Sequence, residues 1–184
     1  MTATVFLIQT VFGFYLLAVM LRFLLQWVRA DFYNPLVQFL VRITNPPLLL
    51  LRRIIPSYRG LDLASLALAF VLQLVERSLI TLLLDQRLSV GGILLLTVAE
   101  LFRLVINIYL WGIVIQAVLS WVNPDPRHPA ARVLTQLTDP VLRPVRRWLP
   151  PVSGVDLSPM VVVVGLIFIS LLLQDLFGSW AGLR

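Results

Sequence analysis

This chain of 184 residues is far more apolar than a soluble protein: 59% of its residues are hydrophobic, 13% are charged and its mean hydropathy is +0.93. A soluble domain is typically about 45–50% apolar and about 25% charged, so the composition excludes an ordinary soluble domain and indicates a membrane protein. The absence of cysteine and the single histidine, His128, exclude disulfides, thiolate metal ligands and a cluster of imidazoles. The net charge of +6 rests on arginine alone, because all 15 basic residues are arginine.

The first predicted element is a membrane span at Val5–Val28. It supplies the roughly 20 apolar residues that a bilayer-spanning helix needs. No basic segment precedes it and no small-residue cleavage site follows a short apolar core, so we expect a retained span and not a signal peptide. A polar connector, residues 29–62, follows this span.

This first connector is patterned like short helices and not like a loop. Asn34-Pro35 has the residue types of an N-cap and a first helical residue, and apolar residues then recur at helical spacing. Asn45-Pro46 repeats the cap pattern, and the helix that it starts should end before Pro56, because the residue before a proline is disfavoured in the α region. The sequence therefore predicts two short amphipathic helices, too apolar for water and too short to span, in the membrane interface or against the spans.

Three more spans are predicted from apolar segments of sufficient length. They are Leu63–Leu84, Ala99–Val122 and Leu157–Phe177. A polar turn, residues 85–92, separates the second span from the third. Because residues 93–98 are apolar again, the third span has room to begin there and tilt.

The second connector, residues 123–156, repeats the first at a fixed offset of 94 residues without a gap. His128-Pro129 and Asp139-Pro140 stand at its cap positions, and Pro150-Pro151 should close its second short helix. The same offset pairs Leu25 with Leu119, Trp27 with Trp121, Asp31 with Asp125, Thr44 with Thr138, Arg52-Arg53 with Arg146-Arg147, and Asp62-Leu63 with Asp156-Leu157. Such self-similarity indicates a duplicated protein.

These elements predict an all-α membrane protein with four transmembrane helices. We expect two tandem parallel two-helix repeats, residues 1–90 and 91–184, each with short interfacial helices in its connector. Arginines set the orientation, because basic loops stay in the cytoplasm. The connectors carry Arg29, Arg42, Arg52, Arg53, Arg59, Arg127, Arg132, Arg143, Arg146 and Arg147, and the opposite side carries Arg87 and Arg184. Both connectors should therefore be cytoplasmic and both termini outside.

A duplicated set of charges marks the predicted cytoplasmic face. It consists of Arg52, Arg53, Asp62, Arg146, Arg147 and Asp156. Arginine pairs beside an interfacial helix can bind anionic lipid headgroups, at about 1 kcal/mol per basic residue, or an acidic segment of a partner. The structural alternative is that these Asp and Arg side chains pair with each other and cap helix ends.

A second set of polar residues lies inside the predicted spans. It consists of Gln73, Glu76, Arg77, Glu100, Arg103 and Asn107. A charge at mid-bilayer costs about 2.5–3.5 kcal/mol on insertion scales, so such residues usually face partners or a cavity. We expect the second and third spans to pack against each other here. Glu76 or Arg77 of the second span should then bond to Glu100, Arg103 or Asn107 of the third. The cluster is either interhelical glue or an ion or proton path, whereas Arg22 should reach the interface by snorkelling.

Catalytic motifs are missing from the sequence: there is no H-E-x-x-H, no Gly-rich phosphate loop and no G-x-S-x-G. Asp62 and Asp156 stand at span starts, where capping explains them. We therefore expect no enzyme, no cofactor and no metal site. The arginines are spread along span ends without an aromatic stacking platform, so direct nucleic-acid binding is not expected either.

The connector motifs closely resemble those of the YggT family, small bacterial inner-membrane proteins with plastid relatives called YlmG. The motifs are Trp27-x-Arg29-x-Asp31-x-x-Asn34-Pro35, Thr44-x-Pro46, Arg52-Arg53-x-x-Pro56, Gly60-x-Asp62 and Gly154-Val155-Asp156-Leu157-Ser158-Pro159. Ala64-Ser65 departs from the Ser-Pro expected there. The resemblance implies a multi-pass protein of the bacterial inner membrane linked to tolerance of osmotic or ionic stress; plastid relatives are linked to cytochrome assembly and to organelle or nucleoid distribution.

Three functional hypotheses remain open. The preferred one is a non-enzymatic membrane protein acting in osmotic or ionic stress tolerance through a partner or as a homo-oligomer. The second is a scaffold or assembly factor whose Arg-rich cytoplasmic helices dock a partner. The third is a subunit of a small ion-conducting oligomer, because four spans alone enclose little lumen. The polar residues of the second and third spans should line a cavity in a conductor and satisfy one another in a scaffold.

Overall fold

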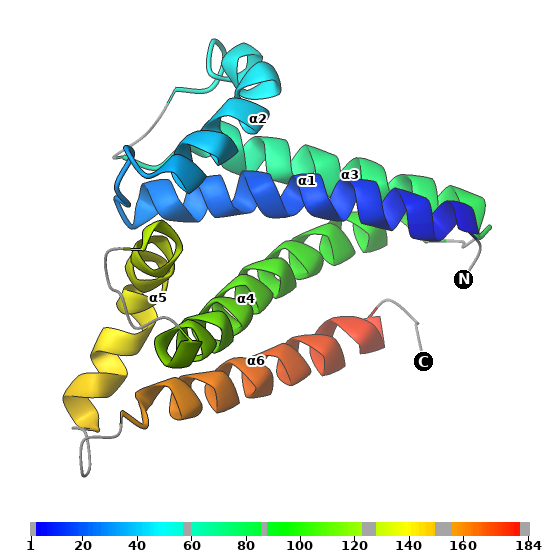
Figure 1. Ribbon diagram of the computed structural model, residues 1–184. Helices are drawn as coiled ribbons and strands as arrows, with labels where there is room; N and C mark the ends of the chain where they lie inside the picture. Colours follow the sequence, from blue (N-terminus) through cyan, green and yellow to red (C-terminus); the bar gives the residue numbers. More distant parts are fainter. Residues whose placement is uncertain (1–2, 57–59, 86–87, 123–127, 150–155, 181–184) are drawn as a thin grey trace.

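The computed structural model describes residues 3–56, 60–85, 88–122, 128–149 and 156–180, which form helices joined by short turns (Figure 1). The helices of this described part are α1 (Ala3–Trp27), α2 (Pro35–Leu51), α3 (Leu63–Leu83), α4 (Val90–Val122), α5 (Pro129–Trp148) and α6 (Ser158–Trp180). The predicted all-α fold is confirmed.

Four of these helices, α1, α3, α4 and α6, are long and apolar enough to cross a membrane, and they match the four predicted spans. α2, with 17 residues, is a shorter apolar helix and is not among these four. α4 begins at Val90, nine residues before the predicted start at Ala99. The Ser89 hydroxyl explains this early start, because it accepts a hydrogen bond from the Gly92 N–H at 3.1 Å in the manner of an N-cap.

The first cap in each connector is confirmed. The Asn34 side chain accepts a hydrogen bond from the Leu36 N–H at 3.0 Å, and Nδ1 of His128 accepts one from the Ala130 N–H at 3.3 Å. α2 ends at Leu51, before Pro56, as predicted. The predicted close of the second connector at Pro150-Pro151 lies outside the described residues.

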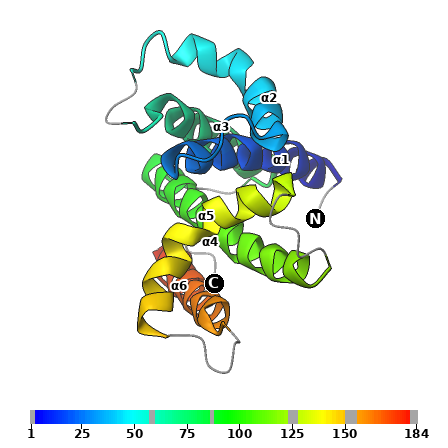
Figure 2. The same ribbon diagram turned by 60° about the vertical axis from the view of Figure 1, so that its left-hand side comes forward.

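The prediction of two short helices in each connector was wrong. α2 continues through Pro46 and α5 continues through Pro140, so Asn45 and Asp139 lie inside helices and do not cap them. A proline inside a helix lacks an N–H and frees the carbonyl four residues earlier, which bends the helix without ending it when the carbonyl finds another partner. Both helices bend along their length in Figure 2.

In α2 the freed carbonyl does find a partner. Pro47 cannot donate to the Ile43 carbonyl, and the Tyr15 hydroxyl of α1 donates to that oxygen instead, over a long 3.5 Å. The neighbouring helix therefore supplies part of what the proline removes. The sequence pattern could not show this compensation, because the donor lies 28 residues away in another helix.

The long helices place α2 and α5 at one end of the molecule, whereas the start of α1 and the end of α6 lie at the other end (Figure 1). α1 packs against α2 and α3, and α4 packs against α3, α5 and α6. The most buried apolar side chains gather on α1, where Val19, Met20 and Leu24 are almost fully enclosed. α6 is the opposite case, because Val162 is its one buried apolar side chain among those described.

α1 ends in a left-handed turn at Arg29, whose φ is +55°. The Ala30 N–H donates to the Leu25 carbonyl at 2.8 Å, and the Arg29 N–H donates to the Gln26 carbonyl at 3.1 Å. These two bonds form a Schellman motif, in which the left-handed position is usually glycine. An arginine here accepts backbone strain of about 1–2 kcal/mol.

Candidate functional site

Two Arg-Asp pairs form on the connector face, in line with the structural alternative given above for these charges. Arg52, just after α2, makes an ion pair with Asp62, which caps α3. The Asp62 carboxylate also accepts hydrogen bonds from the Ser65 hydroxyl at 2.7 Å and from the Ser65 N–H at 3.4 Å. Burial raises the pKa of this carboxyl, but the bonds from Arg52 and Ser65 outweigh it, so the pKa lies below its ordinary value.

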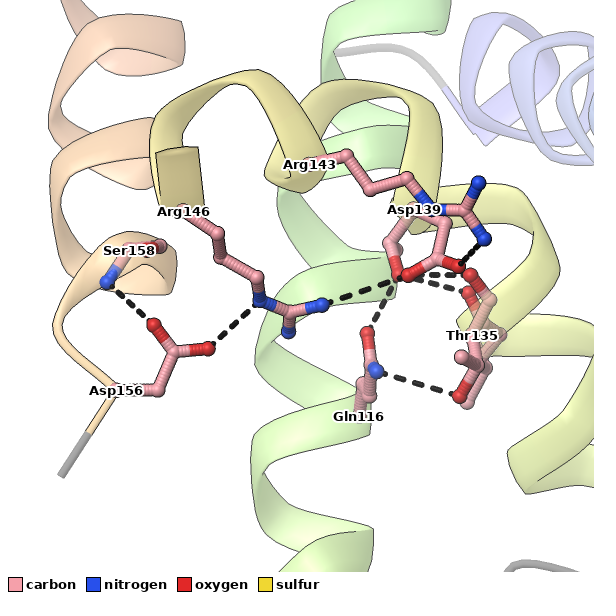
Figure 3. A network of polar contacts seen from close by, with 9 residues as sticks. Gln116, Thr135, Asp139, Arg143, Arg146, Asp156 and Ser158 are labelled. Atoms are coloured by element: carbon pink, nitrogen blue, oxygen red, sulfur yellow. Dashed lines mark hydrogen bonds and ion pairs between the residues drawn. The ribbon is translucent and has the colours of Figure 1, made fainter. Parts of the chain in front are cut away.

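The corresponding ion pair in the second half is more exposed to solvent and belongs to a larger network of polar contacts (Figure 3). Nε of Arg146 lies 2.8 Å from the Asp156 carboxylate, which accepts a bond from the Ser158 N–H at 2.9 Å. Arg146 also reaches Asp139 at 3.5 Å, and Arg143 lies 2.9 Å from the same carboxylate. Desolvation raises the pKa of Asp156, but the bonds from Ser158 and Arg146 bring it below its ordinary value.

The arginines directly after Arg52 and Arg146 in the sequence take no part in these ion pairs. Arg53 and Arg147 are exposed and form no hydrogen bond or ion pair within the described ranges. Each is followed by a large exposed apolar side chain, Ile54 at 80% and Trp148 at 86%. The predicted face therefore divides into paired residues that fix helix ends and free arginines that remain available for a ligand.

A joint between α2 and α5 was not predicted. Asp31 pairs with Arg132 at 3.1 Å, and the Asp31 N–H donates to the Gln136 side chain at 3.1 Å. The side-chain amide of Asn34 donates to the Pro129 carbonyl at 2.9 Å. These contacts join the two connectors across about 100 residues of sequence, as the separation of 105 between Asp31 and Gln136 shows. Asp125, the sequence counterpart of Asp31, lies outside the described residues.

The structure brings all six predicted intramembrane polar residues to one cavity of about 290 Å³. Its polar lining consists of Gln9, Gln73, Glu76, Arg77, Glu100, Arg103 and Asn107. The predicted contact between the second and third spans is confirmed, because Arg77 of α3 pairs with Glu100 of α4 at 3.2 Å. The Gln73 amide donates to Glu100 at 2.7 Å and to Glu76 at 3.2 Å, so one amide holds both carboxylates.

A second cavity, of about 320 Å³, lies on the other side of this ion pair. Arg77, Glu100 and Arg103 line both cavities, and α6 contributes Ser170 and Gln174 to the second one. Arg103 and Asn107 form no hydrogen bond or ion pair in the part of the chain that is described. The cluster is thus half bonded within itself, whereas Arg103 is exposed and Asn107 is half-buried.

Sequence reasoning missed Gln9 and Ser170 at these cavities, although the signal was present. The offset of 94 residues assigns Gln9 to Arg103 and Ser170 to Glu76. The sequence showed only that the charges lack charged counterparts. In space, the uncharged counterparts lie around the same charges, because α1 and α6 flank the α3–α4 pair.

The contact that Arg22 makes was not predicted. Arg22, which we expect to reach the interface, is buried, with 6% exposure, against α2. Its Nη1 donates to the Thr44 hydroxyl at 2.7 Å and to the Val41 carbonyl at 3.2 Å. The signal for this contact was again the offset, which assigns Gln116 to Arg22. Gln116 accepts a hydrogen bond from the hydroxyl of Thr138, the counterpart of Thr44.

Four long apolar helices, with polar residues gathered at one end and in an interior cluster, define this chain as a multi-pass membrane protein by length and composition. A family model described as CCB3/YggT matches residues 1–83 and 95–177. The chain belongs to the CCB3/YggT family. The resemblance seen in the connector motifs is thereby confirmed.

Individual relatives cover nearly the whole chain. An uncharacterized protein of Pseudomonas aeruginosa is 42% identical over 186 residues, which is 99% of this chain and 93% of the relative. An uncharacterized protein of Vibrio alginolyticus is 40% identical and covers 97% of both chains. The uncharacterized protein YggT of Escherichia coli is 37% identical, over 93% of this chain and 89% of its own length. No solved structure matches significantly.

Proposed function

We propose that this chain is a non-enzymatic multi-pass protein of the bacterial inner membrane that acts in osmotic or ionic stress tolerance, as an oligomer or through a partner. One observation carries the proposal: four charged side chains, Glu76, Arg77, Glu100 and Arg103, meet at cavities between membrane-spanning helices. Charges at this depth cost stability, and in membrane proteins they usually mark a pathway or a partner site.

The charges of the cluster are only partly paired with one another, which favours contact with an ion over a purely structural role. Two carboxylates and two guanidiniums balance each other, yet only Arg77 and Glu100 form an ion pair within the described part. Arg103 faces both cavities without a bonded carboxylate. An ion that enters either cavity would therefore meet an unpaired charge, which a purely structural cluster does not need.

The proposal includes a topology. The connectors are the arginine-rich side of the chain, so they should lie in the cytoplasm with α2 and α5 in the membrane interface. It also includes a tandem duplication, supported by the two segments matched by the family model, which begin 94 residues apart. The Arg52–Asp62 and Arg146–Asp156 pairs recur at the same offset and give it further support.

The test combines growth with transport. Cells that lack the protein are complemented with wild type, with Glu100→Gln or with Asp175→Asn and grown at high salt. Glu100→Gln breaks the pair with Arg77 and should fail to restore growth, whereas Asp175 is an exposed carboxylate on α6 and its variant should restore it. Asn107→Leu alters the cavity without breaking a bond and guards against loss of folding. Normal growth with Glu100→Gln and with Asn107→Leu, at wild-type protein levels, would contradict the proposal.

Liposomes separate the two modes of action. Wild-type protein that dissipates a potassium or proton gradient, while Glu100→Gln does not, supports a conducting oligomer. Silence in liposomes together with a co-purifying membrane complex supports action through a partner. A scaffold or assembly factor is the second candidate function, and it is favoured by the exposed Arg53-Ile54 and Arg147-Trp148 pairs on the connector face.

A further inference from the structure

A basic cavity lies between α1 and α2 at the connector end of the molecule. Its volume is about 370 Å³. Its polar lining consists of Arg22, Gln26, Arg29 and Arg52, and its apolar lining consists of Leu25, Ala30, Phe32, Val37, Leu40 and Val41. No carboxylate lines it. A cavity lined by both cationic and apolar side chains matches an amphiphile with an anionic group.

Arg22 is the inner charge of this cavity. Its Nη1 is bonded to Thr44 and to the Val41 carbonyl, which fixes the plane of the guanidinium. Nε and Nη2 have no partner among the described residues, and no described carboxylate forms an ion pair with this arginine. A guanidinium presents five N–H donors in a rigid fork that suits phosphate oxygens, so the donors left over are available to an anion.

The other two arginines complete the cationic side. Arg52 shares its charge with Asp62, but its buried Nε has no hydrogen-bond partner. Arg29 is exposed and is held at the rim by the left-handed turn that ends α1. Three positive charges thus face one bound carboxylate, and the excess positive charge is concentrated around the cavity.

The second half of the molecule does not repeat this charge. Gln116 stands where the offset of 94 residues places the counterpart of Arg22, and it bonds Thr138 as Arg22 bonds Thr44. In the sequence, Asn123 is the counterpart of Arg29. The contact between the long helix and the connector helix therefore does not require an arginine. The charge at Arg22 and Arg29 is an addition that the packing leaves unexplained.

We infer that this cavity binds the phosphate group of an anionic phospholipid, with the apolar wall against the lipid's glycerol and chains. Arg22 lies five residues before the end of α1, roughly 7.5 Å along the helix, which is the depth of the headgroup region when α1 spans the bilayer. The inference is independent of the function proposed above, because that function rests on the cluster between α3 and α4. Free phosphate shares the same chemistry, and the experiment separates the two sources.

The test uses purified full-length protein in a neutral detergent and labelled dioleoyl-phosphatidylglycerol as the probe. Arg22→Gln and Arg29→Asn copy the residues that the sequence carries 94 positions later, and asparagine tolerates the left-handed conformation at position 29. Each variant should retain the lipid about fivefold less tightly, which is the effect of one basic residue near a membrane surface. Thermal unfolding checks that both variants are folded. Arg42→Gln is the matched control, because it removes an exposed charge of α2 at the same end and Arg42 does not line the cavity.

The outcomes are distinct. Loss of retention in Arg22→Gln and Arg29→Asn, with Arg42→Gln like wild type and phosphatidylcholine not retained, supports the site. Displacement of the lipid by inorganic phosphate would assign recognition to the phosphate alone, and failure of displacement would assign it to phosphate plus chains. Both results keep the anionic site. Wild-type retention in the two variants, or an equal loss in Arg42→Gln, would overturn the site by leaving only general surface charge.

Discussion

The two Arg-Asp ion pairs at the starts of α3 and α6 lie in different environments. The Asp62 side chain is fully buried, whereas the Asp156 side chain is 36% exposed, although both cap a long helix and accept an arginine. A buried carboxylate that loses its charge leaves its arginine uncompensated, whereas an exposed pair contributes little. Burial, which the sequence pattern of Gly-x-Asp-Leu does not encode, decides the energetic difference.

We therefore expect Asp62→Asn to lower the free energy of unfolding by about 1–3 kcal/mol and Asp156→Asn by less than about 1 kcal/mol. Thermal unfolding in detergent measures both. Because the pKa of Asp62 is lowered by folding, its stabilisation is present above the unfolded pKa of about 4 and is lost as the pH falls further. The difference between wild type and Asp62→Asn should shrink below that pH; a constant difference at all pH values would argue against the ion pair.

Arg29 offers a second test at this scale. Arg29→Gly and Arg29→Ala remove the same guanidinium, but only glycine adopts the φ of +55° without strain. Arg29→Gly should be more stable than Arg29→Ala by about 1 kcal/mol, as measured by thermal unfolding, while both lose lipid retention equally. Equal stability of the two variants would show that the turn rearranges when the arginine is removed.

At the scale of the elements, the connectors differ most from their prediction. Their first caps were readable because Asn-Pro and His-Pro are local signals, and the four spans were readable because length and apolar composition decide them. Asn45-Pro46 in α2 and Asp139-Pro140 in α5 have the same residue types as an N-cap followed by a proline, although they lie inside helices. Whether a proline ends a helix depends on partners for the freed carbonyl, and the Tyr15 contact with Ile43 comes from another helix.

The two cap residues should respond differently to truncation. Asn34→Ala removes both the cap of α2 and the bond to the Pro129 carbonyl of α5, and we expect a loss of about 1–2 kcal/mol. His128→Ala removes only an exposed cap, with an expected loss of about 0.5–1 kcal/mol. Thermal unfolding of the two variants measures the difference. Equal losses would mean that the α2–α5 joint contributes nothing to stability.

The orientation of the whole molecule in the membrane can be tested by cysteine labelling. The chain contains no cysteine, so each introduced cysteine is the single labelling site. Ile54→Cys lies on the connector face at 80% exposure and Val90→Cys on the opposite end at 76%. With a membrane-impermeant maleimide on intact spheroplasts, position 90 should be labelled and position 54 only after lysis. The reverse pattern would place the connectors outside.

The sequence predicted the residues of the intramembrane polar cluster but not the helices that surround them. All six polar residues of the second and third spans were named from their cost in a bilayer, and they do meet at one cavity. Their enclosure by α1 and α6, and the basic cavity between α1 and α2, depend on which helices become neighbours. Helical periodicity shows that a face is buried but does not show which helix covers it.

Buried Arg22 finally bears on how the chain is made. Its partner Thr44 follows only 22 residues later in the chain, so both leave the ribosome close together. The first membrane helix thus carries a charge whose bonding groups arrive with the next helix synthesised. We expect the docking of α2 against α1 to be an early step of biogenesis that satisfies this buried charge.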